Sequence, residues 1–147
     1  MIRNGWLIAG GALSATAALA HLALIVGGPR WYRFFGAGEG MARAAERGEW
    51  RPALITGFIA GVLAIWAAYA FSGAALIRPL PLLRTALVAI SAIYIARGLV
   101  LFYPSALARP DLSSDFLVWS SLIVLVIGLL HAVGTWQAWS SLTPIER

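Results

Sequence analysis

Four long apolar runs constrain this chain more than any other feature of its sequence. They cover, in chain order, about residues 6–28, 52–77, 82–103 and 115–139. A helix of about 20 residues crosses the roughly 30 Å hydrocarbon layer of a membrane, whereas the strands of a membrane barrel are shorter and alternate in polarity. The runs therefore predict an all-α integral membrane protein, a four-helix transmembrane bundle that forms one domain over residues 1–147.

The composition agrees with a membrane protein and excludes several other classes. Hydrophobic residues make up 61% of the chain and charged residues 12%, whereas a soluble domain carries about 25% charged residues. The net charge of +5 comes from arginines near the ends of the runs, where they meet membrane lipids, so we expect no nucleic-acid partner. The chain has no cysteine, which excludes disulfides, thiolate metal sites and iron–sulfur clusters.

The location of the protein is inferred from two further features. Within the first run, Ala18-Leu19-Ala20 resembles the cleavage site of a secretory signal. The run continues without a charge to residue 28, however, and this length favours an uncleaved first span. The absence of lysine, together with abundant alanine and glycine, is typical of a GC-rich bacterial genome. We therefore expect a multi-pass protein of the bacterial cytoplasmic (inner) membrane, with its orientation left open by a nearly even distribution of arginines.

The longest connection, residues 29–51, lies on the membrane face that we call side B; the N-terminus lies on the other face, side A. Four aromatic residues in this loop are typical of a membrane interface, namely Trp31, Tyr32, Phe34 and Phe35. A glycine-rich turn, GAGEG, then leads into MARAAER, which is followed by Gly48. The loop is thus expected to form a short amphipathic, interfacial helix that covers the side B end of the bundle as a lid.

Small residues indicate where helices approach closely. Gly57 and Gly61 form a GxxxG motif in the second run, and such pairs allow two helix backbones to come into contact. Packing inside the bundle is the favoured interpretation, and a homo-oligomer through Gly57 and Gly61 is the alternative.

Arg97 and its neighbours form the candidate site. Arg97 lies six residues, about 9 Å, from the side B end of its run, and His21 lies equally far from the side B end of the first run. Tyr94 precedes Arg97 by one turn, Ser121 falls in the same half, and Glu39 in the lid supplies an acid. We expect these five residues to form a ligand-binding cluster, without catalytic or metal-ligating residues.

Two other interpretations of the polar residues stay open. Arg97 could instead extend to the side B headgroups, or form a structural ion pair with Glu39, Glu46 or Asp115. The second histidine, His131, is expected about 12 Å in depth from His21, too far for the two to share one metal ion. The cofactor is therefore left open, with haem or a quinone as candidates.

The function predicted from these features is the binding or transport of a small amphiphile or organic anion in a polar cavity in one half of the bundle. Arg97 would hold the head, Tyr94 would donate a hydrogen bond, and His21 would accept a bond or relay a proton. One alternative is a non-catalytic accessory or assembly subunit of a larger membrane complex. The other is a lipid-modifying membrane enzyme, which is disfavoured because the sequence contains no visible set of nucleophile, base and orienting residue.

Overall fold

The computed structural model describes residues 3–103 and 114–142 of the chain. The helices are α1 (Gly5–Phe34), α2 (Glu39–Glu46), α3 (Arg51–Gly73), α4 (Leu83–Leu99), the short 3-10 helix η1 (Val100–Phe102) and α5 (Ser114–Gln137). Four segments are long and apolar enough to cross a membrane: Gly5–Phe34, Arg51–Gly73, Leu83–Phe102 and Asp115–Gln137. The all-α, four-helix membrane bundle that the sequence predicts is thus confirmed.

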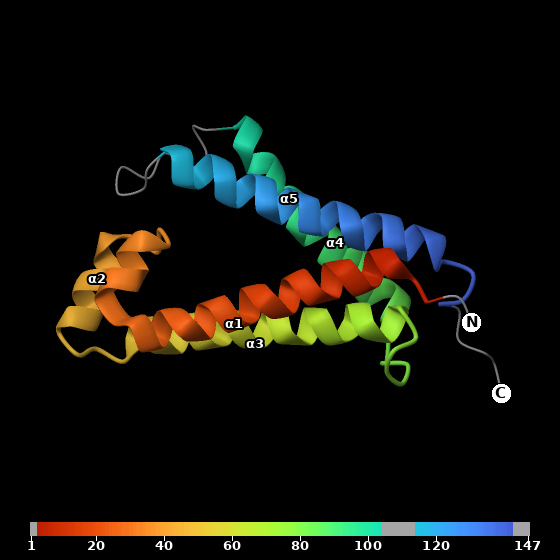
Figure 1. Ribbon diagram of the computed structural model, residues 1–147, viewed down its shortest axis with the longest axis horizontal. Coiled ribbons are helices and arrows are strands. Elements are labelled where there is room, and N and C mark those ends of the chain that lie inside the picture. The colour runs from red at the N-terminus through yellow and green to blue at the C-terminus, as the bar shows by residue number, and fades with distance from the viewer. Residues whose placement is uncertain (1–2, 104–113, 143–147) are drawn as a thin grey trace.

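The long helix α1 bends at Gly28, where the first apolar run of the sequence ends. Gly28 has a φ of 65° and a ψ of −152°, and Pro29 follows it. Proline disfavours the helical conformation in the residue before it, so glycine, which tolerates positive φ, takes up the break. The remainder of α1 then turns toward α2 (Figure 1).

The helices form two pairs, α1 with α3 and α4 with α5, which diverge toward side B (Figure 1). Near side A one buried cluster joins both pairs and consists of Leu7, Ala74, Leu87, Ala138 and Leu142. A second cluster, deeper in the bundle, again draws on all four long helices and consists of Ala18, Leu63, Ile90, Tyr94 and Ile127. The third cluster, at side B, contains only Leu24, Tyr32 and Ala42, all from α1 and α2. The four-helix core therefore occupies the side A half of the molecule.

Within the second pair, glycines on both helices permit a close crossing. A Cβ atom added to Gly98 of α4 would lie 2.7 Å from the Cα of Leu125, and one added to Gly128 of α5 would lie 2.9 Å from the backbone nitrogen of Ile95. Each glycine thus faces the backbone of the other helix. This is the use of small residues expected inside a membrane, where close backbone contact contributes to helix association.

The GxxxG motif of α3 does not serve this purpose. The face of α3 that packs inward is formed by Thr56, Ala60, Leu63 and Ala67. Gly61 is exposed, and a Cβ added there would meet nothing within 4 Å. The favoured expectation that Gly57 and Gly61 pack within the bundle is therefore wrong for Gly61, because the buried face lies one residue position away from it around the helix.

Candidate functional site

The polar interior of the bundle centres on Tyr94, which is 4% exposed. Its hydroxyl shares a hydrogen bond of 2.9 Å with the Ser14 hydroxyl of α1. Its ring meets Trp66 of α3 edge-on at a centroid distance of 4.8 Å, and the imidazole of His131 on α5 at 5.3 Å. Tyr94 of α4 thus contacts all three other long helices, and its bond to Ser14 joins the two helix pairs.

His131 belongs to this interior, although the sequence did not point to it as a site residue. The imidazole is fully buried, and its Nδ1 lies 2.9 Å from the carbonyl oxygen of Ile127. Because a carbonyl oxygen only accepts, Nδ1 carries the hydrogen and Nε2 is the acceptor. Nε2 has no hydrogen-bond partner within residues 3–103 and 114–142. The ring also packs against Gly10, eleven residues and about 16 Å along α1 from His21, so the two histidines do not share a site.

Helical spacing places both Ser14 and His131 on inward faces, although neither was selected from the sequence as a site residue. Ser14 and His131 lie on the same stripes as Gly10 and Gly128, and serine or histidine among small residues is a signal of an inward face. The sequence could not show which residue of one stripe faces which residue of another. That pairing depends on the angle and offset between helices, and only the structure supplies it.

Arg97 continues the inner stripe of α4 beyond the four-helix core. The preceding members, Leu87, Ile90 and Tyr94, are all buried, whereas Arg97 is exposed. The change from buried to exposed occurs where the two helix pairs diverge. Arg97 Nη1 donates a hydrogen bond of 2.9 Å to the hydroxyl of Ser121, which is itself fully buried. The structure thus brings together two of the five residues selected from the sequence and fixes the position of the guanidinium.

His21 lies at the corresponding place on α1. The buried positions Ser14 and Ala18 precede it on the same stripe, and His21 itself is half-buried. Its Nδ1 lies 2.7 Å from the carbonyl oxygen of Ala17, which leaves Nε2 as an acceptor. His21 and Arg97 are both on the side B side of the Ser14–Tyr94 bond, but no hydrogen bond joins them.

Glu39 does not close the site as expected. Both oxygens of its carboxylate accept hydrogen bonds of 2.9 Å from Arg33, and Arg43 adds another of 3.0 Å. Glu46 pairs with Arg33 as well, at 2.8 Å. Arg33 is near in sequence and reaches these acids after the bend of α1, so the acids stay at the junction of α1 and α2. The lid helix is thus anchored to the first helix pair, and these acids are not the partners of Arg97.

The lid helix α2 is held by this ion-pair network and by a small apolar contact. Ala42 is fully buried against Leu24 and Tyr32, so Tyr32 packs under the helix and is not part of the expected interfacial aromatic cluster. Trp31, Phe34 and Phe35 do pack together, with centroid distances of 5.7 Å for Trp31–Phe35 and 5.0 Å for Phe34–Phe35. Also on side B, the Phe116 ring of α5 contacts Gly36 and connects the loop to the second pair.

Acidification is expected to release α2. Hydrogen bonds from Arg33, and secondly from Arg43, hold the pKa of Glu39 at about 2, below the ordinary 4.5, and Arg33 also lowers the pKa of Glu46. Because these pKa values are lower when α2 is docked, the network stabilises docking fully above about pH 4.5, and that contribution is lost as the pH falls toward 2.

Hydrogen exchange of the amides in residues 39–46 should therefore stay slow down to about pH 4 and become several-fold faster, after correction for intrinsic rates, between pH 4 and 2. Arg33→Gln should give the faster exchange already at neutral pH. Arg47→Gln is the matched control, since Arg47 pairs with Glu49. Equal exchange in both variants would show that the apolar contact alone holds the lid.

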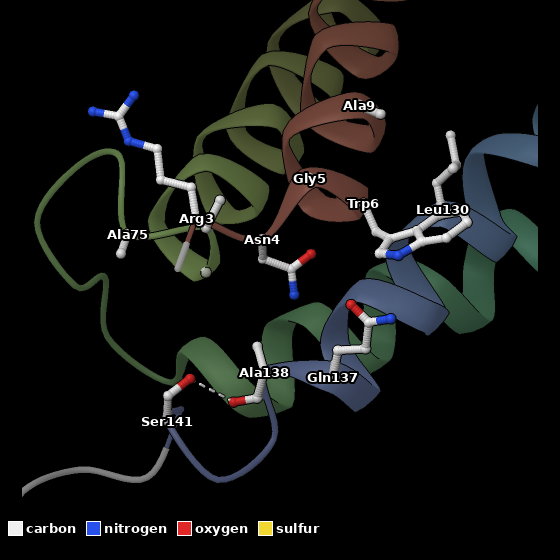
Figure 2. A pocket seen from close by; sticks show the side chains of 12 residues that line it. Arg3, Asn4, Gly5, Trp6, Ala9, Ala75, Leu130, Gln137, Ala138 and Ser141 are labelled. Carbon is white, nitrogen blue, oxygen red and sulfur yellow. Dashed lines mark hydrogen bonds between the residues drawn. The ribbon is translucent and has the colours of Figure 1, made fainter. Parts of the chain in front are cut away.

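A hollow of about 640 Å³ opens at the other end of the molecule, on side A, where the sequence indicated no site. Asn4 closes one edge of it by donating a hydrogen bond of 2.8 Å to the Gly134 carbonyl oxygen and accepting one from the Leu7 amide. In Figure 2 the Arg3 guanidinium points away from the space between Asn4 and Gln137. The polar side chains here either join α1 to α5 or are exposed, so this hollow provides no buried polar group for a ligand.

No protein-family model, curated protein sequence or solved structure matches this chain significantly. The geometry of the described residues is therefore the basis for assigning a function.

Proposed function

We propose that this chain is a multi-pass protein of the bacterial inner membrane that binds, or passes, an amphiphile with an anionic head in the side B half of its bundle. The observation that carries the proposal is the position of Arg97. It is the exposed continuation of an otherwise buried inner stripe, and Ser121 holds it there. A cation in this position is suited to an anionic head.

The charges around Arg97 support this assignment. The two lid acids that could neutralise it, Glu39 and Glu46, are bound to Arg33. Among the described residues, Ser121 is the hydrogen-bond partner of Arg97, and a serine hydroxyl leaves the positive charge uncompensated. Guanidinium groups bind carboxylate and phosphate through short, charge-assisted hydrogen bonds, which are stronger where water is scarce.

The surroundings of Arg97 favour an amphiphile over a small hydrophilic anion. Ile93, one turn before Arg97 on the same face of α4, is large, apolar and 52% exposed. An acyl chain attached to the anionic head would lie along such a side chain within the membrane. His21 on α1 lies on the same side of the Ser14–Tyr94 bond, and its Nε2 would accept a hydrogen bond from a hydroxyl on the head. Tyr94 positions the two helix pairs through Ser14.

Replacing Arg97 tests the proposal directly. Wild-type protein in mild detergent should retain palmitate in native mass spectrometry, and Arg97→Gln should retain it roughly ten- to a hundredfold less well, because hydrogen bonds to charged groups contribute about 1.5–3 kcal/mol. Methyl palmitate has the same acyl chain without the charge. The wild type and Arg97→Gln should bind it equally, and more weakly than the wild type binds palmitate.

Arg30→Gln is the matched control, since Arg30 is also exposed on side B but lies beyond the bend of α1. The Arg30→Gln variant should retain palmitate as well as the wild type does. Equal losses of palmitate retention in Arg30→Gln and Arg97→Gln would contradict the proposal. They would mean that arginines on side B attract anions without a specific site, and that Arg97 serves to anchor the bundle to lipid headgroups. A homo-oligomer in which two copies touch through Gly57 and Gly61 stays a separate prediction. Gly61 is available for such a contact, because nothing lies within 4 Å of a Cβ added there.

A further inference from the structure

A groove of about 470 Å³ runs along the second helix pair in the side A half of the molecule. It is lined by Val88 and Ser91 of α4, by Ala132, Thr135 and Trp136 of α5, and by Trp139 just after α5. None of these residues is charged. The groove is separate from the Arg97 region, since Thr135 and Ser121 are fourteen residues, about 21 Å, apart along α5.

Thr135 contributes a buried hydroxyl that lacks a partner. The residue is 4% exposed, and its Oγ1 makes no hydrogen bond to any residue that the structure describes. Hydroxyls in helices usually donate to the carbonyl oxygen four residues earlier. Thr16 does so at 2.9 Å and Ser91 at 2.7 Å. Because a buried hydroxyl loses its bonds to water, an unpaired one next to a groove indicates a place for an acceptor on a ligand.

The rest of the groove defines the shape and polarity of that ligand. Trp136 and Trp139 are 77% and 45% exposed and present flat indole surfaces. Arg84 holds Trp139 in place, with its guanidinium carbon 4.2 Å from the ring centroid and a hydrogen bond of 2.8 Å to the Trp139 carbonyl oxygen. The hydroxyl hydrogen of Ser91 is directed to Leu87, which leaves Thr135 as the hydroxyl donor of the groove. Flat aromatic walls favour a flat ring.

We propose that this groove binds a flat, uncharged, membrane-dissolved ring compound that carries a carbonyl oxygen, the chemistry of a quinone. Rotation about the Cα–Cβ bond of Thr135 turns the hydroxyl, whose Oγ1 is covered in this structure, toward the groove. There it donates a hydrogen bond to the carbonyl, and an indole lies along the ring. The ligand enters from the lipid, because Trp136 of α5 and Trp139 just after it, which wall the groove, are both exposed.

The test compares two probes that share a ring system. Menadione is a methylated naphthalene with two carbonyls, and 2-methylnaphthalene has none. In equilibrium dialysis against detergent micelles, corrected with protein-free micelles, wild-type protein should bind menadione more tightly. Thr135→Val keeps the volume and removes the hydroxyl, and it should weaken menadione binding roughly fivefold, the effect typical of one hydrogen bond. Binding of 2-methylnaphthalene should not change.

Further variants separate the hydroxyl from general effects on the fold. Thr16→Val changes an exposed threonine outside the groove and should bind menadione like the wild type. Thr135→Ser retains the hydroxyl and should preserve binding even if Thr135→Val unfolds. Trp136→Ala should weaken both probes. Equal binding of the two probes by wild-type protein, or unchanged menadione binding in a folded Thr135→Val, would overturn the proposal.

Discussion

Gly98→Ala is expected to separate α4 from α5 and to destabilise the bundle by about 3 kcal/mol, the upper end of the usual range for overpacking a core. The added Cβ would lie 2.6 Å, 2.7 Å and 2.8 Å from the Cβ, Cα and backbone nitrogen of Leu125. Two of these atoms are backbone, so no side-chain rotation relieves the clash. The helices must move apart, and Ser121, one turn from Leu125, moves away from Arg97.

Thermal unfolding in detergent measures the effect, with Gly61→Ala as the matched control. Both glycines lie within apolar helices, but a Cβ at Gly61 meets nothing within 4 Å. In that variant the better helix propensity of alanine should leave stability unchanged or slightly higher. Palmitate retention should fall in Gly98→Ala and not in Gly61→Ala, because only the first change disturbs the Arg97–Ser121 bond. Equal melting temperatures for the two variants would refute the close crossing of α4 and α5.

The elements of this fold could be predicted because membrane helices are long and uniformly apolar. The backbone preferences of neighbouring residues determine the end of the first run at residue 28, the glycine-rich turn before α2 and the short helix α2 itself. Gly28 and Pro29 break α1 by their own backbone preferences, and Gly36 and Gly38 adopt positive φ values of 63° and 95°. Such features depend on neighbouring residues only, and the sequence contains them completely.

The faces of the helices were harder to predict for a physical reason. A soluble helix reveals its buried face by contrast with a polar one, but a helix that faces lipid is apolar on every side. Small residues were the remaining signal, and α3 carries two stripes of them. The stripe with Gly57 and Gly61 matched a known motif, yet the stripe with Ala60 and Ala67 is the buried one.

Only part of the candidate site was predicted. The depth of a residue in the membrane follows from its position along a helix, whereas contacts between side chains of different helices do not. Arg97 and Ser121 were placed in the same half of the membrane and do bond to each other. Glu39 was expected to reach that half from the lid. The sequence could not show that Arg33, rather than Arg97, would pair with Glu39. Which arginine reaches Glu39 depends on the direction that the chain takes after the bend at residue 28.

Gly10→Ala is expected to destabilise the joint between the two helix pairs by about 1–3 kcal/mol. A Cβ at Gly10 would lie 2.7 Å from Nδ1 and 2.9 Å from Cε1 of His131. The imidazole cannot yield easily, because it is fully buried, bonded to the Ile127 carbonyl oxygen and packed against the ring of Tyr94. The helix pairs would therefore separate where Ser14 and Tyr94 hold them together.

A double-mutant cycle identifies the imidazole as the cause. His131→Ala removes the ring that the new methyl group meets, so Gly10→Ala should be at least about 1 kcal/mol less destabilising in that background, a coupling typical of residues in contact. Gly5→Ala is the control on the same helix, because nothing lies within 4 Å of its added Cβ. The readout is again thermal unfolding in detergent. Should Gly10→Ala destabilise the protein equally with and without the imidazole, His131 does not lie against α1, and the polar interior built around Tyr94 would have to be revised.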